Sequence, residues 1–364
     1  MRILMICPLL SSSSFITTYP MVKALERDHE VTILGPTFGK PLYIKDDSLR
    51  IVTIEPIVRH PMQAGYLSLL PKVKAYLKKH ANEYDVVHAF KPVFHTGYAA
   101  AKAKEETRKP LVLSIDDYDQ IASKNWMKRS LLSIAARSVK QADAITVSSS
   151  QLQQVYGGTV IRQVACEPAF KRRQPERKRI RKKYNIEDKI VIFHGGTFYP
   201  HKGIDILIRA VQKLKERGHN VALLLAGEPI GPYRSLARDE TIFCGMVPME
   251  EMPDYVAACD IYAIPTRDTP YARAEIPAKI FEPMMLGKAI VASSISDIPE
   301  LLDHGNAGVL SRPDSVHDLT IKLEELITDR DLRVAVGRNA KKRYDKNYSY
   351  DVIARQLKVV YKNF

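Results

Sequence analysis

The fold is decided by residues 189–218, which read KIVIFHGGTFYPHKGIDILIRAVQKLKERG. The apolar run at 189–193 predicts a buried strand, and the polar, glycine-containing stretch after it predicts a turn. From Ile204 onward apolar residues recur at helical spacing, and Gly218 ends this pattern as glycine commonly ends a helix. A strand, a glycine turn and an amphipathic helix in this order predict one unit of a parallel α/β sheet.

The same alternation extends over nearly the whole chain. Further strands are expected at residues 2–7, 30–34, 50–54, 85–89, 110–115, 144–147, 221–226, 260–264 and 289–292. Helices are expected at residues 15–27, 69–80, 128–141, 249–259 and 350–361, and another should end near Gly287. Continuous apolar strands between helices predict parallel sheets that are covered on both faces.

The alternation pauses at the basic, proline-containing residues 168–183, which predicts a domain boundary near residue 170. A length of 364 residues suits two domains, and 45% hydrophobic with 26% charged residues indicates a globular chain. The opening MRILMICP lacks the long apolar stretch of a secretory signal, and no apolar run approaches the ~18 residues of a membrane span. The four cysteines form no C-x-x-C pair, which argues against a disulfide framework or a zinc site. We therefore expect a cytoplasmic protein.

A formal net charge of +14 favours phosphate-rich or anionic partners. Much of this charge lies in residues 171–183, which begin with Lys171, end with Lys183 and contain nine Lys or Arg and one acid, Glu176. The segment could be a solvated helix face, or it could hold the protein on an anionic membrane surface. Base-stacking aromatic residues do not interleave with it, so no nucleic acid is expected as a partner.

Two common nucleotide motifs are missing from the sequence. The loop after the first strand reads CPLLSSSS at residues 7–14 and contains no glycine, so a nicotinamide or flavin cofactor is not expected there. No G-x-x-x-x-G-K-[ST] phosphate loop is present either. We expect no bound cofactor.

Residues after the strand at 189–193 suit phosphate binding. Gly195 and Gly196 let a ligand approach the backbone, and Lys202 adds a charge to the positive end of the next helix. The alternative is a solvated lysine at a turn.

A second candidate is Glu282, which lies between apolar residues on a predicted helix. A buried carboxylate needs partners, and the two hydroxyls of a ribose would supply them. The alternative is a structural ion pair with Lys279 or Lys288.

Three stretches together resemble a known family. They read HGGTFYPHKGIDILIRAVQKL, FCGMVPMEEMPDYVAACDIYAIPT and PAKIFEPMMLGKAIVASSISDIPELL, and they cover most of residues 185–312. They look like the donor half of the large retaining glycosyltransferase family four, "glycosyl transferases group 1", of the GT-B fold. The first half resembles this family more weakly, through HEVTILGP and YDVVHAF. The closing NYSYDVIARQLKVVYKNF resembles its terminal helix, which crosses back to the first domain.

The resemblance implies an α/β protein of two Rossmann-like parallel-sheet domains that face a central cleft. Residues 1–170, with the helix at 346–364 packed back on them, would form the acceptor-side domain. Residues 171–345 would form the nucleotide-sugar donor domain.

The resemblance also implies roles for residues. The phosphate-binding lysine falls on Lys202, and the glutamate that holds the donor ribose falls on Glu282. Residues 243–247 should lie against the base, with Met246 and Val247 among the donor-binding residues. An active-site residue after the fifth strand falls on Asp116 or Asp117, at the strand end where such sheets bind ligands. Gly195, Gly196 and Thr197 complete the phosphate turn.

Two positions depart from the family pattern. Thr197 stands where the family has a phosphate-binding arginine. Ala274 stands where it has the first glutamate of its motif, with Glu275 one residue late. Arg267, Arg273 or Glu275 could compensate, and we include Arg273 and Glu275 among the donor-binding residues.

The implied enzyme moves a sugar from a nucleotide-diphosphate sugar, UDP- or GDP-linked, to an acceptor hydroxyl with retention of anomeric configuration. The acceptor would be a glycan, lipid or small molecule in polysaccharide, glycolipid or glycoconjugate synthesis. No metal site is expected, and the Asp116–Asp117 pair is the one candidate that could overturn this. Two alternatives are a sugar-nucleotide epimerase of the same fold and a non-catalytic protein that binds a nucleotide sugar or a partner protein.

Overall fold

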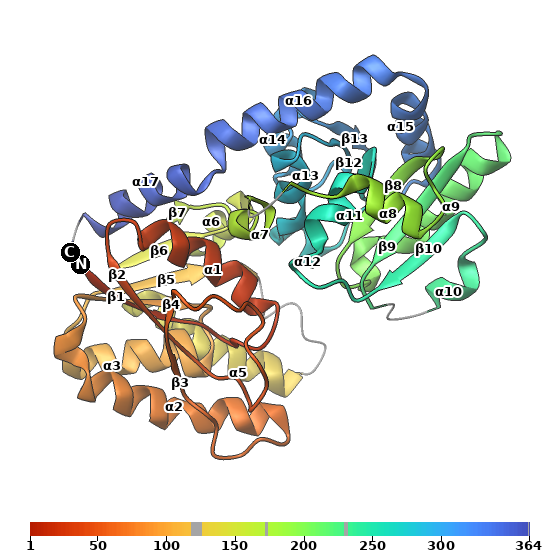
Figure 1. Cartoon of the computed structure of the whole chain (residues 1–364). Helices are drawn as coiled ribbons and strands as arrows, with labels where there is room; N and C mark the ends of the chain where they lie inside the picture. The colour runs from red at the N-terminus through yellow and green to blue at the C-terminus, as the bar shows by residue number, and fades with distance from the viewer. Residues whose placement is uncertain (118–125, 172–173, 229–231, 363) are drawn as a thin grey trace. The chain divides into compact units, whose positions relative to one another are not determined.

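The computed structural model describes residues 1–117, 126–171, 174–228, 232–362 and 364, without the side chains of residues 127 and 128. The chain divides into two compact units (Figure 1). The first unit combines Met1–Gln163 with Tyr350–Phe364, and the second is Val164–Ser349. This division falls a few residues before the expected boundary near residue 170.

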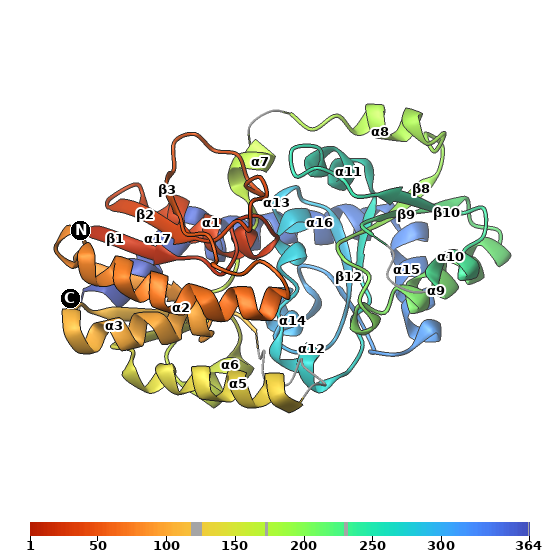
Figure 2. The ribbon, with the colours of Figure 1, turned by 90° about the horizontal axis from the view of Figure 1, so that it is seen from below.

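The first unit contains a parallel sheet of seven strands in the order β3-β2-β1-β4-β5-β6-β7. These strands are β1 (Arg2–Ile6), β2 (Glu30–Gly35), β3 (Arg50–Thr53), β4 (Val86–Phe90), β5 (Leu111–Ile115), β6 (Ala144–Val147) and β7 (Thr159–Val160). Its helices include α1 (Ser14–Leu25), α2 (Met62–Lys79), α3 (Ala99–Thr107), α5 (Trp126–Ala136), α6 (Ser150–Tyr156) and α17 (Tyr350–Tyr361). Helices α2 and α3 cover one face of the sheet, and α1 and α17 lie side by side on the other (Figure 2).

Helix α17 is held to the first unit by its own side chains. Tyr361 is buried, and its hydroxyl contacts Nδ1 of His88 on β4 at 2.5 Å. Asp351 pairs with Arg27, and Lys358 pairs with Asp28 at 2.7 Å. The last helix of the chain is therefore part of the first unit.

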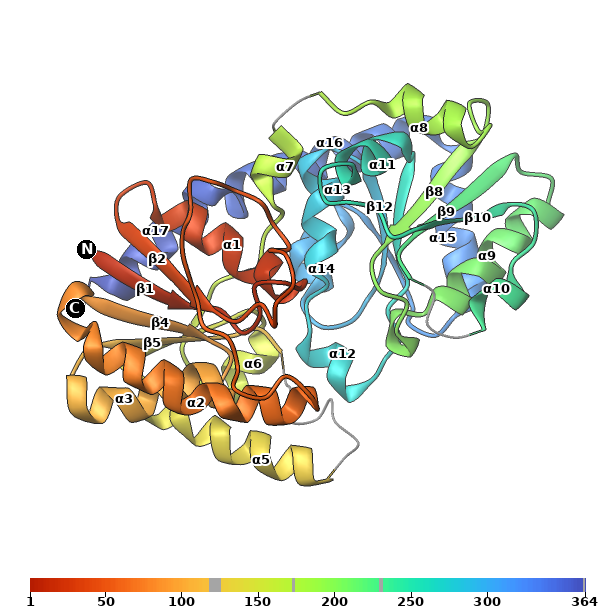
Figure 3. The ribbon, with the colours of Figure 1, turned by 60° about the horizontal axis from the view of Figure 1, so that its bottom comes forward.

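The second unit contains a parallel sheet of six strands in the order β10-β9-β8-β11-β12-β13. These strands are β8 (Ile190–Gly195), β9 (Val221–Ala226), β10 (Thr241–Gly245), β11 (Ile261–Ile264), β12 (Ala289–Ser293) and β13 (Val309–Ser311). Its helices include α7 (Glu167–Lys171), α8 (Arg177–Lys183), α9 (Ile204–Glu216), α10 (Tyr233–Leu236), α11 (Met252–Ala258), α12 (Pro270–Ala274), α13 (Phe281–Met285), α14 (Ile298–Leu301), α15 (Val316–Thr328) and α16 (Arg330–Asn347). Helices α9, α10 and α15 lie on one side of the sheet, and α8, α11 and α13 lie on the other (Figure 3).

The predicted fold class is confirmed, since each unit is a parallel sheet between helices. The helix expected to end near Gly287 is shorter than its pattern suggested. It consists of a 3-10 turn at Ala278–Ile280 and the five residues of α13. Proline at 277 and 283 explains this, because proline removes a backbone donor and restricts the residue before it. Within the described residues, no helix has both the length and the apolar character needed to cross a membrane.

Candidate functional site

The turn between β8 and α9 is built tightly against its neighbours. Gly203 has φ of 65°, and a Cβ there would lie 1.9 Å from the carbonyl oxygen of Pro265. The backbone N–H of Arg267 donates to the carbonyl of His201 at 2.8 Å. Gly196 has φ of 140°, yet a Cβ there would meet no atom within 4 Å. The turn thus rests on the end of β11 and leaves open space beside Gly196, whose own N–H donates to the carbonyl of Ala226 at 2.8 Å.

Lys202 forms a charged contact within this turn. Its Nζ lies 2.7 Å from Oε1 of Glu275, and Nε2 of His201 lies 3.4 Å from the other carboxylate oxygen. The Lys202 side chain is only 18% exposed, so it is not the solvated turn lysine of the alternative interpretation. Burial raises the pKa of Glu275, but the Lys202 charge and the hydrogen bonds from His201 and Lys202 outweigh burial and lower it to about 2.

Glu282 is a buried carboxylate in the first turn of α13. Its Oε1 lies 3.3 Å from Nζ of Lys279, and its Oε2 is buried with no hydrogen-bond partner among the described residues. Burial raises the pKa of Glu282, and Lys279 opposes that rise. Lys288, the other candidate partner, donates instead to the carbonyls of Ala257 and Cys259. The ion pair of the alternative interpretation therefore involves one oxygen and leaves the other for a donor.

His194 and Tyr262 are buried residues whose pKa values are affected by the charges of these groups, and the sequence pattern did not indicate either residue. Nδ1 of His194 contacts the carbonyl of Ala263 at 2.8 Å. Burial lowers the pKa of His194 to about 4 against the effect of that hydrogen bond, and the charges of Lys202 and Lys279 lower it further. The Tyr262 hydroxyl would lie 3.5 Å from a Cβ on Gly195, and burial raises its pKa, with the Glu282 charge adding to the rise. The only local signal for His194 is its position directly before the glycines.

The remaining predicted donor residues are more exposed. Thr197 is exposed, Val247 is half-buried, and Met246 after β10 is 67% exposed. The Arg273 side chain is 61% exposed and donates twice to Asp268. Arg267, which was considered as a compensating cation, instead pairs with two acids on other elements, Asp205 and Asp314.

In the first unit, Asp116 and Asp117 follow the end of β5 and share a cation that the sequence analysis missed. Nζ of Lys91, the residue after β4, lies 3.3 Å from Oδ1 of Asp116 and 2.5 Å from Oδ2 of Asp117. Lys91 has φ of 63°, and its N–H donates to the carbonyl of Ser114 at 2.8 Å. Whether one of the two aspartates instead caps a following helix depends on residues 118–125, which lie outside the described residues.

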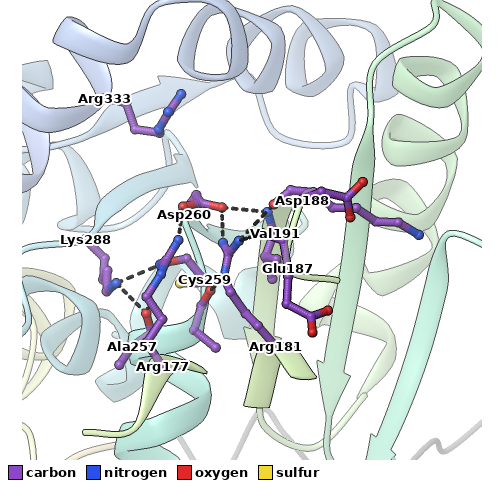
Figure 4. Close-up of polar contacts among 12 residues, drawn as sticks. Arg177, Arg181, Glu187, Asp188, Val191, Ala257, Cys259, Asp260, Lys288 and Arg333 are labelled. Atoms are coloured by element: carbon purple, nitrogen blue, oxygen red, sulfur yellow. Dashed lines mark hydrogen bonds and ion pairs between the residues drawn. The ribbon is translucent and has the colours of Figure 1, made fainter. Parts of the chain in front are cut away.

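Several basic side chains of residues 171–183 form ion pairs and hydrogen bonds with other elements of the second unit. Arg177 and Arg181 of α8 both reach Asp260, at the start of β11 (Figure 4). Arg181 also donates to three backbone carbonyls, and Arg179 pairs with the buried Asp254 at 2.6 Å. These contacts attach α8 to the end of α11 and the sheet. Lys178 and Lys182 point outward as exposed residues.

Across the described parts of both units, no three His, Cys, Asp or Glu side chains are grouped to hold a metal ion. The anionic and cationic residues above are thus paired mainly with one another.

Comparisons with known proteins agree with this architecture. The family model for "Glycosyltransferase Family 4" matches residues 16–159, and that for "Glycosyl transferases group 1" matches residues 176–343. An uncharacterised glycosyltransferase of Methanocaldococcus jannaschii is 23% identical over 92% of this chain and 90% of its own.

Solved structures share the fold. Sucrose-phosphate synthase of Thermosynechococcus elongatus has a TM-score of 0.78 at 17% identity, covering 100% of this chain and 98% of its own. Anabaena HepE in complex with UDP-glucose has a TM-score of 0.76 at 20% identity, covering 100% of both chains. With a family model matched in each unit and the two-sheet fold in common, the chain belongs to the nucleotide-sugar-dependent glycosyltransferases of group 1, with the GT-B fold.

Proposed function

We propose that the enzyme transfers a sugar from a UDP- or GDP-sugar to an acceptor hydroxyl with retention of anomeric configuration. The donor binds at the carboxyl ends of β8 and β11 in the second unit, with its ribose on Glu282 and its diphosphate on Lys202. The observation that carries this proposal is the buried Oε2 of Glu282, which has no partner among the described residues. A ribose hydroxyl can donate a hydrogen bond to this carboxylate oxygen.

The main task of the site is to stabilise the diphosphate as it leaves. Lys202 supplies a fixed positive charge, and the open space at Gly196 lets the phosphates approach the turn. As the sugar–phosphate bond breaks, the anomeric carbon gains positive charge, the acceptor hydroxyl attacks from the face that the diphosphate leaves, and the hydroxyl proton passes to the departing phosphate oxygen. Glu275 keeps Lys202 in position, because the two side chains are 2.7 Å apart.

The donor is identified by titrating UDP, GDP, ADP and dTDP into the protein in a thermal-shift assay, since a bound ligand raises apparent stability. We expect UDP or GDP to raise the melting temperature most. NMR of the product then gives its anomeric configuration, and an inverted product would contradict the proposal. Turnover of the nucleotide sugar in the absence of any acceptor would indicate the epimerase instead.

Asp116 and Asp117 are proposed to act on the acceptor or on the donor sugar. Both carboxylates contact the Lys91 ammonium, whose Nζ lies 3.3 Å from Asp116 and 2.5 Å from Asp117. Asp116→Asn and Asp117→Asn should each be compared with wild type. We expect at least one to lower turnover while nucleoside diphosphate affinity stays unchanged. Wild-type activity in both variants would refute this role.

We also propose a cytoplasmic enzyme that associates with the inner membrane face through residues 171–183. Lys178 and Lys182 are exposed, and each basic residue near an anionic surface contributes about 1 kcal/mol before screening. Co-sedimentation with phosphatidylserine vesicles at low salt tests this. Binding that is unchanged after neutralisation of the basic residues of 171–183, or no binding by wild type, rules it out.

A further inference from the structure

A diphosphate leaving group carries more negative charge than one lysine balances. Lys202 is one cation of the proposed donor site, but Thr197 is neutral where the related pattern has an arginine. Catalysis of this kind depends on fixed positive groups around the leaving oxygens. A second cation should therefore come from elsewhere in the second unit.

Three other basic side chains of the second unit are held by partners of their own. Arg267 pairs with Asp205 and Asp314, and Arg273 is exposed beside Asp268. Lys288 donates to two backbone carbonyls at the end of α11. None of these contacts involves the two carboxylates of the donor site, Glu275 and Glu282.

Lys279 differs from those three cations. Lys279 forms an ion pair with the proposed ribose-binding carboxylate, Glu282, at 3.3 Å, and the Lys279 side chain is 30% exposed. Lys279 sits in the 3-10 turn directly before α13, one turn ahead of Glu282. In a nucleotide the diphosphate is joined to the ribose through a single methylene group. A flexible lysine beside the ribose-binding carboxylate is therefore within reach of the phosphates.

Lys279 is also related to the turn between β8 and α9, which carries Lys202. The charges of Lys202 and Lys279 both act on His194, the buried residue directly before Gly195. Lys202 lies in the turn before α9, and Lys279 lies in the turn before α13. Each is paired with a carboxylate, Lys202 with Glu275 and Lys279 with Glu282.

We infer that Lys279 is the second cation that binds the donor diphosphate and takes the place of the arginine missing at Thr197. The inference rests on the proposed donor site, in which Glu282 holds the ribose. It assigns the two phosphates to two lysines, each balanced by its own glutamate. Lys279 is then a catalytic residue, because it touches the leaving group.

The test compares Lys279→Met, Lys279→Arg and Lys202→Met by calorimetric titration with UDP and GDP, and with the matching uncharged nucleosides. Lys279→Met should weaken binding of the preferred diphosphate about 10-fold or more, while nucleoside binding changes much less. Lys279→Arg should retain most of the affinity. Lys322→Met is the matched control, because Lys322 forms an i,i+3 pair with Glu325 on α15 and is 31% exposed.

A second-site variant separates charge from fold. Thr197→Arg, introduced into Lys279→Met, should restore diphosphate affinity and turnover at least in part. Equal loss of nucleoside and diphosphate binding in Lys279→Met would mean that the lysine only positions Glu282, and would overturn the inference. Wild-type diphosphate affinity in Lys279→Met, with reduced affinity in Lys202→Met, would overturn it and leave the donor site intact. Failure of wild type to bind any nucleoside diphosphate would overturn the donor site itself.

Discussion

Lys202 is the residue whose removal should affect catalysis most directly. Lys202→Ala removes a positive group from the leaving diphosphate, a loss that typically lowers kcat by about 10²–10³. The loss should lie toward the upper end, since Thr197 supplies no charge. Steady-state kinetics with the preferred donor measures it. A reduction of less than about fivefold would exclude contact between Lys202 and the diphosphate.

Glu282 should govern nucleotide affinity more than turnover. Hydrogen bonds to a charged group contribute about 1.5–3 kcal/mol, so Glu282→Gln should weaken nucleoside diphosphate binding roughly 10- to 150-fold. Calorimetry measures the affinity, and circular dichroism checks that the variant is folded. If the carboxylate serves only its ion pair with Lys279, the variant will lose thermal stability and keep its affinity.

Glu275 should make the stability of the folded protein depend on pH in the acidic range. Its pKa of about 2 in the folded protein lies below the ordinary 4.5, so its contribution is complete above pH 4.5 and is lost as the pH falls toward 2. Melting temperatures of wild type and Glu275→Gln should therefore approach each other as the pH falls from 5 toward 2. Glu216→Gln, which removes an exposed partner of Arg238, is the control and should leave the wild-type pH profile unchanged. A constant difference between wild type and Glu275→Gln would contradict the lowered pKa.

The sequence indicated some of these residues and not others, for a physical reason. Gly196, Lys202 and Glu282 stand out because their own neighbours in the sequence make them unusual. The contact of Lys91 with Asp116 joins the ends of two adjacent strands, and no local pattern carries that pairing. The contact of Lys202 with Glu275 joins residues even further apart in the chain.

The turn before α9 should be sensitive to the addition of a single methyl group. Gly203→Ala places a Cβ 1.9 Å from the carbonyl of Pro265 and forces alanine to φ of 65°. Such strain costs on the order of 1–3 kcal/mol or more, and it would shift the backbone that carries Lys202. Thermal unfolding and diphosphate titration should both show the loss.

Gly218 provides a matched control at the other end of α9. It has φ of 89°, but a Cβ there would meet nothing within 4 Å. Gly218→Ala should therefore lower stability less and leave diphosphate affinity unchanged. Equal effects of the two substitutions would mean that contact with Pro265 does not matter.

The elements that the sequence predicted are those with a strong apolar pattern. The central strands appear where continuous apolar runs stand, because both of their faces are buried. Strands β7, β10 and β13 were not predicted, and each lies at the edge of its sheet with few buried residues. Short edge strands depend on a neighbour for pairing, which no periodicity reveals.

At the scale of the molecule, helix α17 should be needed for the stability of the first unit. Deletion of residues 350–364 would uncover one side of α1 and leave His88 without the Tyr361 hydroxyl. We expect a lower melting temperature for the first unit and a smaller effect on the second. Calorimetric scanning distinguishes the two transitions, and hydrogen exchange assigns them. Loss of protection confined to the second unit would contradict this expectation.

Because the chain returns to its first unit at α17, the two units are completed in a fixed order during translation. Residues 350–364 are translated after residues 164–349, so the first unit stays incomplete while the second is being translated. The second unit is continuous in sequence and can close as soon as it emerges, since domains generally fold as units. The unit whose strands are translated earlier is thus completed later, and its α1 face stays uncovered until α17 has been made.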